Sequence, residues 1–375
     1  MKILLVCDQF DNANNGTTIS AKRFAETLSA HGNEIRVIST GDPREGKYVV
    51  QEWRVPIFDK LIKSQGMAFG RPEKNVLQEA ISWADVVHFT MPFALSIEGR
   101  KVAEELGVPH TAAFHVQPEN ITSSVHLGNA SMVNEAIYAG FRTIFYNKFT
   151  HIHCPSNFIA EQLRSHGYTA RLHVISNGIS EAFQYRKEEK PAQWKDRIVL
   201  TMIGRLTREK RQDVVMDAAL LSKYRDRIQL VFAGHGPLLE AYQKQGERLP
   251  FAPVMRFFTQ EELLRLLAFS DLYLHAADVE IEAIACIEAF ASGLVPVIAD
   301  SPKSATPQFA LDERSLFAAG DPAALAARID YWLDHEEERR RMEKIYAEQA
   351  DKYRIDACVY QIEEMFRMAM DEQRR

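Results

Sequence analysis

Short apolar runs alternate with amphipathic helical patterns along the whole chain of 375 residues. A helical pattern over 21–32, for example, ends at Gly32. This alternation predicts parallel sheets with helices on both faces, because parallel strands need crossover connections. The runs expected to form strands are 2–7, 34–39, 85–89, 111–114, 151–154, 172–175, 197–203, 229–233, 255–258, 272–276 and 295–299.

The chain is too long for one hydrophobic core, so two domains are expected. The strand–helix rhythm restarts at residue 197, after a polar stretch over 180–195 that is broken by Pro191. We therefore expect an α/β protein with domains 1–180 and 181–354. Beyond residue 330 the pattern is helical throughout, with helices expected over 328–335, 336–350 and 355–374.

Composition excludes several classes of protein. No apolar run approaches the roughly 18 residues of a membrane span, and the N-terminal run is too short for a signal peptide. The four scattered cysteines indicate reduced thiols in a cytoplasmic protein. Residues 1–178 hold 17 basic and 17 acidic residues, so the whole net charge of −6 falls beyond them. Without a basic domain, no nucleic-acid partner is expected.

Polar residues follow four of the expected strands. Gly16 comes after the first strand, His115 after the run 111–114, Arg205 after 197–203 and Glu280 after 272–276. Parallel sheets bind ligands at the carboxyl ends of their strands. We therefore expect four loops, two from each domain, to line one cleft between the domains.

Two glutamates bracket the expected start of a helix after the strand 272–276. Glu280 lies in the loop, Glu288 lies in the early turns, and the amides between them form a site for phosphate. Carboxylates beside an anion site are explained by sugar hydroxyls, which donate hydrogen bonds to them. Glu282 is a third acid nearby. The alternative is a surface helix start that favours acidic residues.

Gly204, Arg205 and Lys210 form a basic turn that opens the next helix. An Arg fork and a Lys point charge suit a diphosphate. The alternative is a solvated basic turn. Because the chain has no Asp-x-Asp motif, we expect the cations to replace a metal, and no essential metal or other cofactor is expected.

The first domain offers weaker signals. The turn containing Gly16 and Thr17 could approach a phosphate or sugar, although a plain turn is as consistent, and the Gly-x-Gly-x-x-Gly fingerprint of a nicotinamide enzyme is absent. His115 opens a polar loop with Gln117, Glu119 and Asn120, whose side chains could bind acceptor hydroxyls. A lone histidine is more often structural.

Residues 57–71 mix apolar side chains with lysines and an arginine. That mixture is typical of peripheral membrane contact, and it is also compatible with an acceptor loop or a buried segment. The aromatic stretch 138–149 is a second candidate for membrane contact, but its pattern favours a core helix.

Four motifs together resemble the retaining glycosyltransferases of family 4. They are Gly204-Arg205 with Lys210, residues 174–179 at the domain junction, Gly234-His-Gly-Pro237, and the stretch from Glu280 to Ile298. The resemblance implies a GT-B fold, in which two Rossmann-like doubly wound domains face a central cleft. It also implies that the first domain binds the acceptor and the second the nucleotide sugar, and that the helix 355–375 returns to the first domain.

The resemblance assigns roles to the residues singled out above. The diphosphate would be held by Arg205 and Lys210, the donor sugar by Glu280 and the ribose by Glu288, with His115 near the donor sugar. We expect catalytic roles for Arg205, Lys210, His115 and Glu280, donor contacts from Gly16, Gly204, Glu282, Ala283, Ile284 and Glu288, and acceptor contacts from Thr17, Gln117, Glu119 and Asn120. The sequence departs from the family pattern at Arg211, where glycine is usual, at Ser180, where aspartate is frequent, and at Glu282-Ala283, where Phe-Gly is usual.

Within the family, residues 114–122 and 304–310, with the basic stretch 60–71, are similar to bacterial diacylglycerol glucosyltransferases. The resemblance thus implies transfer of a hexose, glucose from UDP-glucose, to an acceptor hydroxyl such as that of diacylglycerol, in the cytoplasm or at the inner face of the plasma membrane. Two alternatives stay open: a nucleotide-sugar epimerase or hydrolase on the same fold, and a non-catalytic protein that binds sugar nucleotides.

Overall fold

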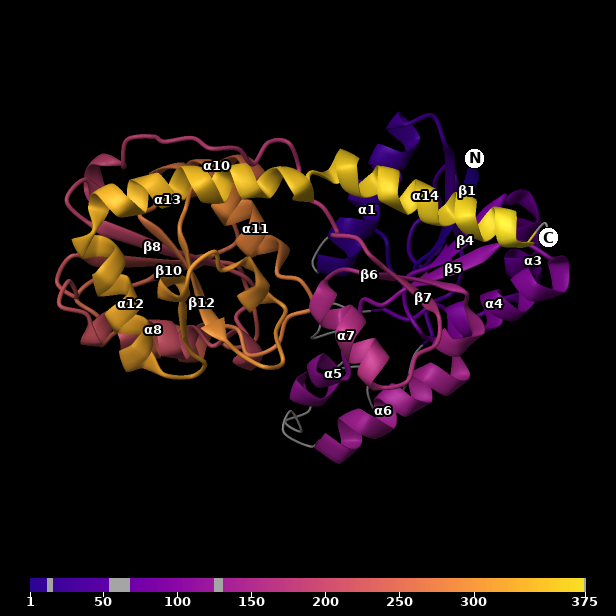
Figure 1. Cartoon of the computed structure of the whole chain (residues 1–375), viewed down its shortest axis with the longest axis horizontal. Coiled ribbons are helices and arrows are strands. Elements are labelled where there is room, and N and C mark those ends of the chain that lie inside the picture. Colours follow the sequence, from indigo (N-terminus) through magenta and orange to yellow (C-terminus); the bar gives the residue numbers. More distant parts are fainter. Residues whose placement is uncertain (12–15, 54–67, 125–130, 374–375) are drawn as a thin grey trace. The chain divides into compact units, whose positions relative to one another are not determined.

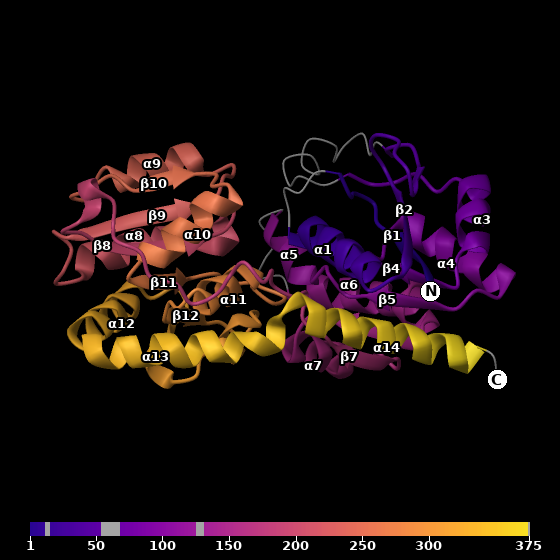
Figure 2. The same cartoon turned by 90° about the horizontal axis from the view of Figure 1, so that it is seen from above.

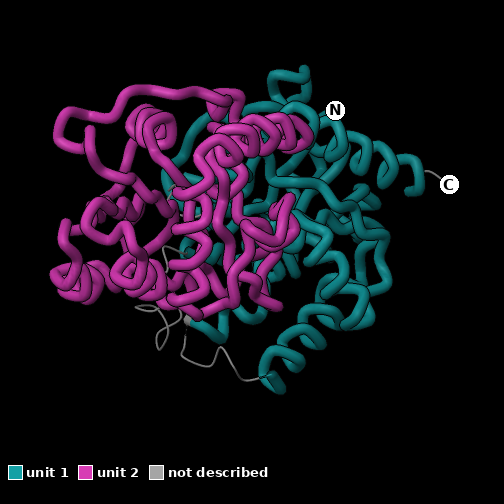
Figure 3. The backbone as a smooth tube through the Cα atoms, turned by 60° about the vertical axis from the view of Figure 1, so that its left-hand side comes forward, with its two compact units in different colours: residues 1–178, 355–375 teal, residues 179–354 magenta. Residues whose placement is uncertain are grey.

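The computed structural model describes residues 1–11, 16–53, 68–124 and 131–373. The chain divides into two compact units, unit 1 being Met1–Gly178 with Ile355–Arg375 and unit 2 being Ile179–Arg354 (Figure 3). Each unit is built on one sheet whose paired strands all run parallel, as the alternating pattern predicts.

The sheet of unit 1 has the order β3-β2-β1-β4-β5-β6-β7. Its inner strand β1 is apolar and buried from its second residue on, which suits a strand covered by helices on both faces. The strands are β1 (Lys2–Val6), β2 (Glu34–Ser39), β3 (Lys47–Val49), β4 (Val86–Phe89), β5 (His110–Ala113), β6 (His151–Cys154) and β7 (Arg171–Val174). The helices are α1 (Gly16–Ala30), α3 (Lys74–Trp83), α4 (Ala94–Leu106), α5 (Pro118–Ser124), α6 (Ser131–Ile144), η1 (Tyr146–Lys148), α7 (Asn157–Ser165) and α14 (Ile355–Gln373).

The last helix, α14, returns to unit 1 and lies beside α1 (Figures 1 and 2). Its apolar residues recur at helical spacing, and those on the inner face, among them Val359, Ile362 and Phe366, are buried against β1 and α1. Met368, another apolar residue of this helix, is 43% exposed.

The sheet of unit 2 has the order β10-β9-β8-β11-β12-β13. The largest fully buried side chain, that of Trp332, belongs to its core. The strands are β8 (Ile198–Ile203), β9 (Ile228–Ala233), β10 (Val254–Arg256), β11 (Leu272–His275), β12 (Pro296–Asp300) and β13 (Leu316–Ala318). The helices are η2 (Ala192–Trp194), η3 (Arg208–Lys210), α8 (Gln212–Leu221), α9 (Leu239–Gly246), α10 (Gln260–Phe269), α11 (Ile284–Ala291), η4 (Thr306–Phe309), η5 (Glu313–Ser315), α12 (Pro322–Asp334), α13 (Glu336–Gln349) and η6 (Ala350–Tyr353).

Four local predictions are corrected. The three-residue edge strands β3 and β13 were not expected, because such short runs carry little pattern. The first helix begins at Gly16 rather than residue 21, and α12 begins at Pro322 rather than residue 328, where Asp321 caps it through the amides of Ala323 and Ala324. The segment after β5 was expected to be a loop, but it forms the helix α5 from Pro118, a residue suited to a first helical turn.

Most of the stretch 57–71 lies outside the described residues. Its described end is packed into unit 1: the amide of Gly70 donates to Asp8 Oδ1 over 2.9 Å, and Phe69 meets Phe93 edge-on at 4.7 Å between ring centroids. Among the helices that the structure describes, none combines the length and the apolar character that a membrane crossing requires.

Candidate active site

The basic turn of unit 2 follows strand β8 directly. Gly204 has a φ of +154°, which favours glycine, and Arg205 follows it half-buried. The Arg205 carbonyl accepts a hydrogen bond from Gln212 Nε2 at 2.9 Å, so the turn is tied to the first residue of α8. Lys210 ends the short helix η3.

The glycines of the Gly234-His-Gly-Pro motif are explained by close approach to this turn. A Cβ on Gly234 would lie 2.0 Å from the Gly204 carbonyl oxygen, and one on Gly236 would lie 2.4 Å from the Leu206 carbonyl oxygen. The backbone confirms the contact, because Leu206 N donates to His235 O over 3.2 Å. The backbone of the Gly234-His-Gly-Pro motif therefore packs directly against the backbone of the basic turn.

Glu280 lies in the loop after β11 and meets Lys210. Lys210 Nζ donates to Glu280 Oε1, and His275 Nε2 lies 3.3 Å from the same oxygen. Burial raises the pKa of Glu280, but the Lys210 ammonium and the His275 imidazole outweigh burial and lower this pKa to about 2. Glu280 is thus ionised at every physiological pH and accepts hydrogen bonds, so it is no general acid.

Residues that follow the neighbouring strand β12 hold the backbone of Glu280 in place. Its carbonyl accepts the amide of Ala305 at 2.8 Å, and it forms a parallel bridge with Ser304. Ser301 Oγ, just beyond β12, donates to the Asp278 carbonyl over 2.6 Å. The sequence motifs did not indicate this support by His275, Ser301 and Ser304.

Helix α11 begins after Ala283, which adopts a left-handed conformation with φ +68°. Ile284 is the first helical residue, so the helix starts where the sequence predicts a site for phosphate. Glu288 lies in the second turn of the helix, within the early turns expected for it, and is 7% exposed. Glu282, in the preceding loop, is 1% exposed, so it is almost entirely shielded from solvent.

In unit 1, Gly16 is the exposed first residue of α1 rather than a loop residue. Among the described residues, a Cβ there would meet nothing within 4 Å, and the φ is not positive, so the described part of the fold does not require glycine at this position. Thr17 follows it, partly buried. Residues 12–15, which precede both, lie outside the described residues.

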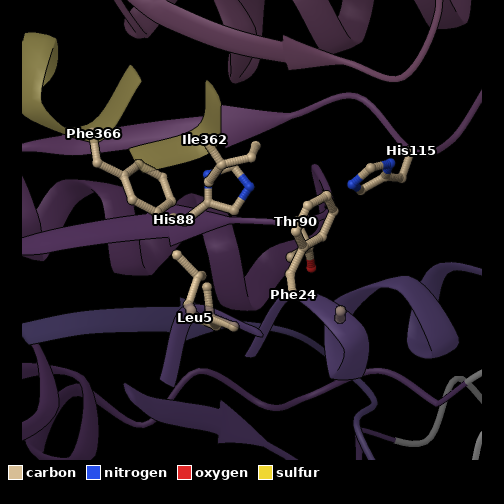
Figure 4. Close-up of a pocket in the computed structure, with 9 residues that line it drawn as sticks. Leu5, Phe24, His88, Thr90, His115, Ile362 and Phe366 are labelled. Atoms are coloured by element: carbon tan, nitrogen blue, oxygen red, sulfur yellow. The ribbon is translucent and has the colours of Figure 1, made fainter. Parts of the chain in front are cut away.

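His115 follows β5 and is 8% exposed. It borders a cavity of about 20 Å³, room for one water, whose walls come from β1, β4, α1 and α14 (Figure 4). Burial lowers the pKa of His115 well below its usual value, and the nearby His153 and His88 lower it further. The His115 imidazole is therefore neutral at pH 7.

The acceptor candidates after His115 lie on or beside α5. Gln117 is 1% exposed and its carbonyl accepts the Asn120 amide at 2.9 Å. Glu119 accepts the Tyr138 hydroxyl at 3.2 Å, and Tyr138 is itself buried in α6. The expected polar loop is thus a short helix joined to α6, and the stretch 138–149 contributes buried core residues.

One carboxyl with a shifted pKa was not singled out from the sequence. Asp8 follows β1, is 6% exposed, and has a pKa that burial raises to about 7 although the Gly70 amide opposes the change. Within the described residues, no group of three or more His, Cys, Asp or Glu side chains is arranged to hold a metal ion.

Comparison with known families identifies the chain. Residues 14–183 match the model described as Glycosyltransferase Family 4, and residues 184–349 match the model described as Glycosyl transferases group 1. The two matches follow one another without a gap. The chain belongs to glycosyltransferase family 4. It is a glycosyltransferase with the GT-B fold, related to glucosyltransferases.

Three individual proteins are similar to this chain. The alpha-monoglucosyldiacylglycerol synthase of Streptococcus pneumoniae is 25% identical over 323 residues, covering 80% of this chain and 71% of the relative. The structure of Anabaena HepE in complex with UDP and glucose has the same fold, with a TM-score of 0.76 at 16% identity, covering 98% of this chain and 100% of HepE. The catalytic domain of cholesterol-alpha-glucosyltransferase from Helicobacter pylori is 46% identical over 42% of this chain and 98% of its own length, with a TM-score of 0.41.

Proposed function

We propose that this glycosyltransferase moves glucose from UDP-glucose to a lipid hydroxyl, with retention of the anomeric configuration. The observation that carries the proposal is the contact between Lys210 and Glu280 at the carboxyl ends of β8 and β11, beside the start of α11. A cation for phosphate, a permanently ionised carboxylate for sugar hydroxyls, and a helix start meet there.

In this proposal unit 2 binds the donor. Lys210 has three N–H donors, of which Glu280 takes one among the described residues, and the other two would bind the diphosphate. The Arg205 guanidinium would bind the same diphosphate. Glu280 accepts hydrogen bonds from hydroxyls of the glucose, and Glu288 accepts them from the ribose. The amides at the start of α11 face the phosphates.

The reaction breaks the bond between the anomeric carbon and the phosphate oxygen and forms a bond from that carbon to the acceptor oxygen on the same face. The leaving phosphate takes the acceptor's proton, so no enzymic nucleophile is needed and Glu280 stays ionised. Arg205 and Lys210 stabilise the charge that develops on the diphosphate, and a single donor of this kind contributes about 10²–10³ in rate. No metal is assigned a role.

The acceptor is the part of the proposal that rests on relatives. The Streptococcus pneumoniae relative is named for a glucosyldiacylglycerol product, and HepE has been seen with UDP-glucose. We assign acceptor binding to unit 1, through Thr17, Gln117, Glu119 and Asn120, with His115 near the transferred sugar. Membrane contact through residues 57–71 is part of the same proposal.

The test supplies UDP-glucose, other nucleotide sugars, or no donor, each with vesicles that contain or lack diacylglycerol. We expect UDP release and an α-linked glucolipid only with UDP-glucose and diacylglycerol together. Lys210→Ala should lower kcat/KM by about 10²–10³, while Lys223→Ala, which breaks an exposed ion pair with Asp334 in the same unit, should leave it unchanged.

Other outcomes are equally clear. Free glucose or an epimer formed without acceptor would favour the hydrolase or epimerase alternative. Donor binding without turnover on any acceptor would favour the non-catalytic alternative, and a soluble acceptor used in place of lipid would refute the lipid proposal.

A further inference from the structure

Two segments of unit 2 contact each other at three points. The first, residues 209–211 at the end of η3, is called the Lys210 loop, and the second, residues 278–280 after β11, is called the Glu280 loop. The Asp278 amide donates to the Glu209 carbonyl over 2.8 Å, Lys210 pairs with Glu280, and Arg211 Nη1 lies 3.2 Å from Asp278 Oδ2. The third contact is not required by the proposed donor site, in which Lys210 and Glu280 hold the ligand. A role for Arg211 therefore needs its own explanation.

The backbone of Arg211 is in a conformation that L-residues avoid. Its φ is +57°, and among the described residues only Arg211 and Ala283 combine a positive φ with a side chain. Such a conformation costs about 1–2 kcal/mol relative to glycine and persists where the surroundings fix it. A side chain here thus needs a compensating interaction.

Carboxylates on both sides fix the Arg211 side chain. Its Nε and Nη2 lie 3.2 Å from Asp213, and Nη1 reaches Asp278 in the other direction. The guanidinium is a rigid fork that can hold two carboxylates at once, whereas the mobile Lys head cannot fix both directions. Asp213 sits in the first turn of α8, so Arg211 links that helix to the Glu280 loop.

We infer that Arg211 is a positioning residue that holds the Lys210 loop against the Glu280 loop, so that both donor-binding groups are in place before the donor arrives. The inference rests on the proposed function for its ligand. When a diphosphate attracts the Lys210 ammonium, the Arg211–Asp278 pair keeps the Glu280 loop where the sugar needs it. Preordering of this kind improves donor affinity without contact to the donor.

The test separates the side chain from the backbone at position 211. Arg211→Gly removes the pair and relieves the positive φ, whereas Arg211→Ala removes the pair and keeps the strain. Two quantities are measured for each variant: hydrogen exchange of the peptide over 272–282, which needs no ligand, and KM and kcat for UDP-glucose. Arg248→Ala is the matched control, because Arg248 pairs with Asp217 at the same 3.2 Å elsewhere in unit 2.

We expect both Arg211 variants to speed exchange at Asp278 and to raise KM for UDP-glucose about tenfold, with kcat changed less. Arg211→Gly should melt above Arg211→Ala despite the same KM, and Arg211→Lys should recover part of the loss. The control should behave as the wild type. In a double-mutant cycle, Asp278→Asn should add little to Arg211→Gly.

Failure of the inference and failure of the proposed function look different. If Arg211→Gly exchanges and turns over as the wild type does, Arg211 positions nothing and the inference is wrong. If exchange rises in the variants while the wild type neither binds nor uses any nucleotide sugar, the contact between the loops stands and the proposed function falls. A loss of kcat and Tm in Arg211→Ala that Arg211→Gly fully repairs would indicate backbone strain alone and would also overturn the inference.

Discussion

His153 is a buried histidine whose titration should couple the stability of unit 1 to pH. It lies on β6 with 0% exposure, and its Nε2 donates to the Ile175 carbonyl over 2.7 Å. The rings of His115 and His88 lie 5.2 and 6.2 Å away between centroids. Burial lowers the pKa of His153 from 6.5 to about 4, although the bond to Ile175 opposes the change.

The magnitude follows from the two pKa values. Between pH 7 and pH 5 the unfolded chain takes up a proton at His153 and the folded unit does not, so stability is lost as pH falls below 6.5. The loss is about 2 kcal/mol by pH 5, from about 1.4 kcal/mol for each unit of pKa difference that is traversed.

Titration of Asp8 should change the stability of unit 1 with pH in the opposite direction. Burial raises its pKa from 3.8 to about 7, so the folded unit takes up a proton between pH 7 and pH 5 while the unfolded chain does not. Stability then rises by about 2 kcal/mol over the same interval. Replacing either residue should therefore change the pH dependence by a similar amount, in opposite directions.

The assay is urea unfolding at pH 7, 6 and 5, followed through hydrogen exchange of peptides from β4 and β6. His153→Gln and His153→Phe should both make acid destabilisation shallower by about 2 kcal/mol, although their stabilities at pH 7 differ. Asp8→Asn should make it steeper by about 2 kcal/mol. Equal pH dependence in the wild type and either His153 variant would refute the reasoning, as would a shallower dependence for Asp8→Asn.

Substitutions to or from glycine give four further predictions, the first three checked by thermal or urea unfolding and the last by turnover. Gly140→Ala on α6, where a Cβ would meet no described atom within 4 Å, should stabilise by about 0.5–1 kcal/mol. Gly99→Ala on α4 should destabilise by about 1–3 kcal/mol, because its Cβ would lie 2.7 Å from the Phe89 ring. Ala283→Gly should stabilise unit 2 by up to about 1 kcal/mol by relieving φ +68°. Gly234→Ala should abolish donor turnover, because its Cβ would collide with the Gly204 carbonyl; wild-type turnover would show that the close approach is not needed.

The strands and the fold class could be predicted because apolar runs report burial directly. Every expected strand is present, and both sheets are parallel. The short edge strands β3 and β13 could not be predicted, because three residues at a sheet edge form by pairing to a neighbour and leave no pattern of their own. The early start of α1 was missed because residues 16–20 hold one large apolar residue, Ile19, and one residue sets no apolar spacing.

The candidate site, like the fold, could be predicted from the sequence only in part. Glu280 was found because it follows a strand, and Lys210 because it lies in a basic turn before a helix. Their pairing depends on β8 and β11 being neighbours, which the sequence does not state. The left-handed conformation of Arg211 and its pair with Asp278 could not be foreseen, although the departure from glycine at position 211 was visible. The roles of these residues toward a donor stay predictions.

The most direct test of the donor site is calorimetric titration of UDP and of UDP-glucose into the wild type, Lys210→Gln and Glu280→Gln. Lys210→Gln should weaken both ligands, because both carry the diphosphate. Glu280→Gln should weaken UDP-glucose by about ten- to a hundredfold while UDP binds at least as well as before, since only the sugar's hydroxyls need the carboxylate. If Glu280→Gln leaves UDP-glucose unaffected, or if Lys210→Gln binds UDP as the wild type does, these residues do not form the donor site.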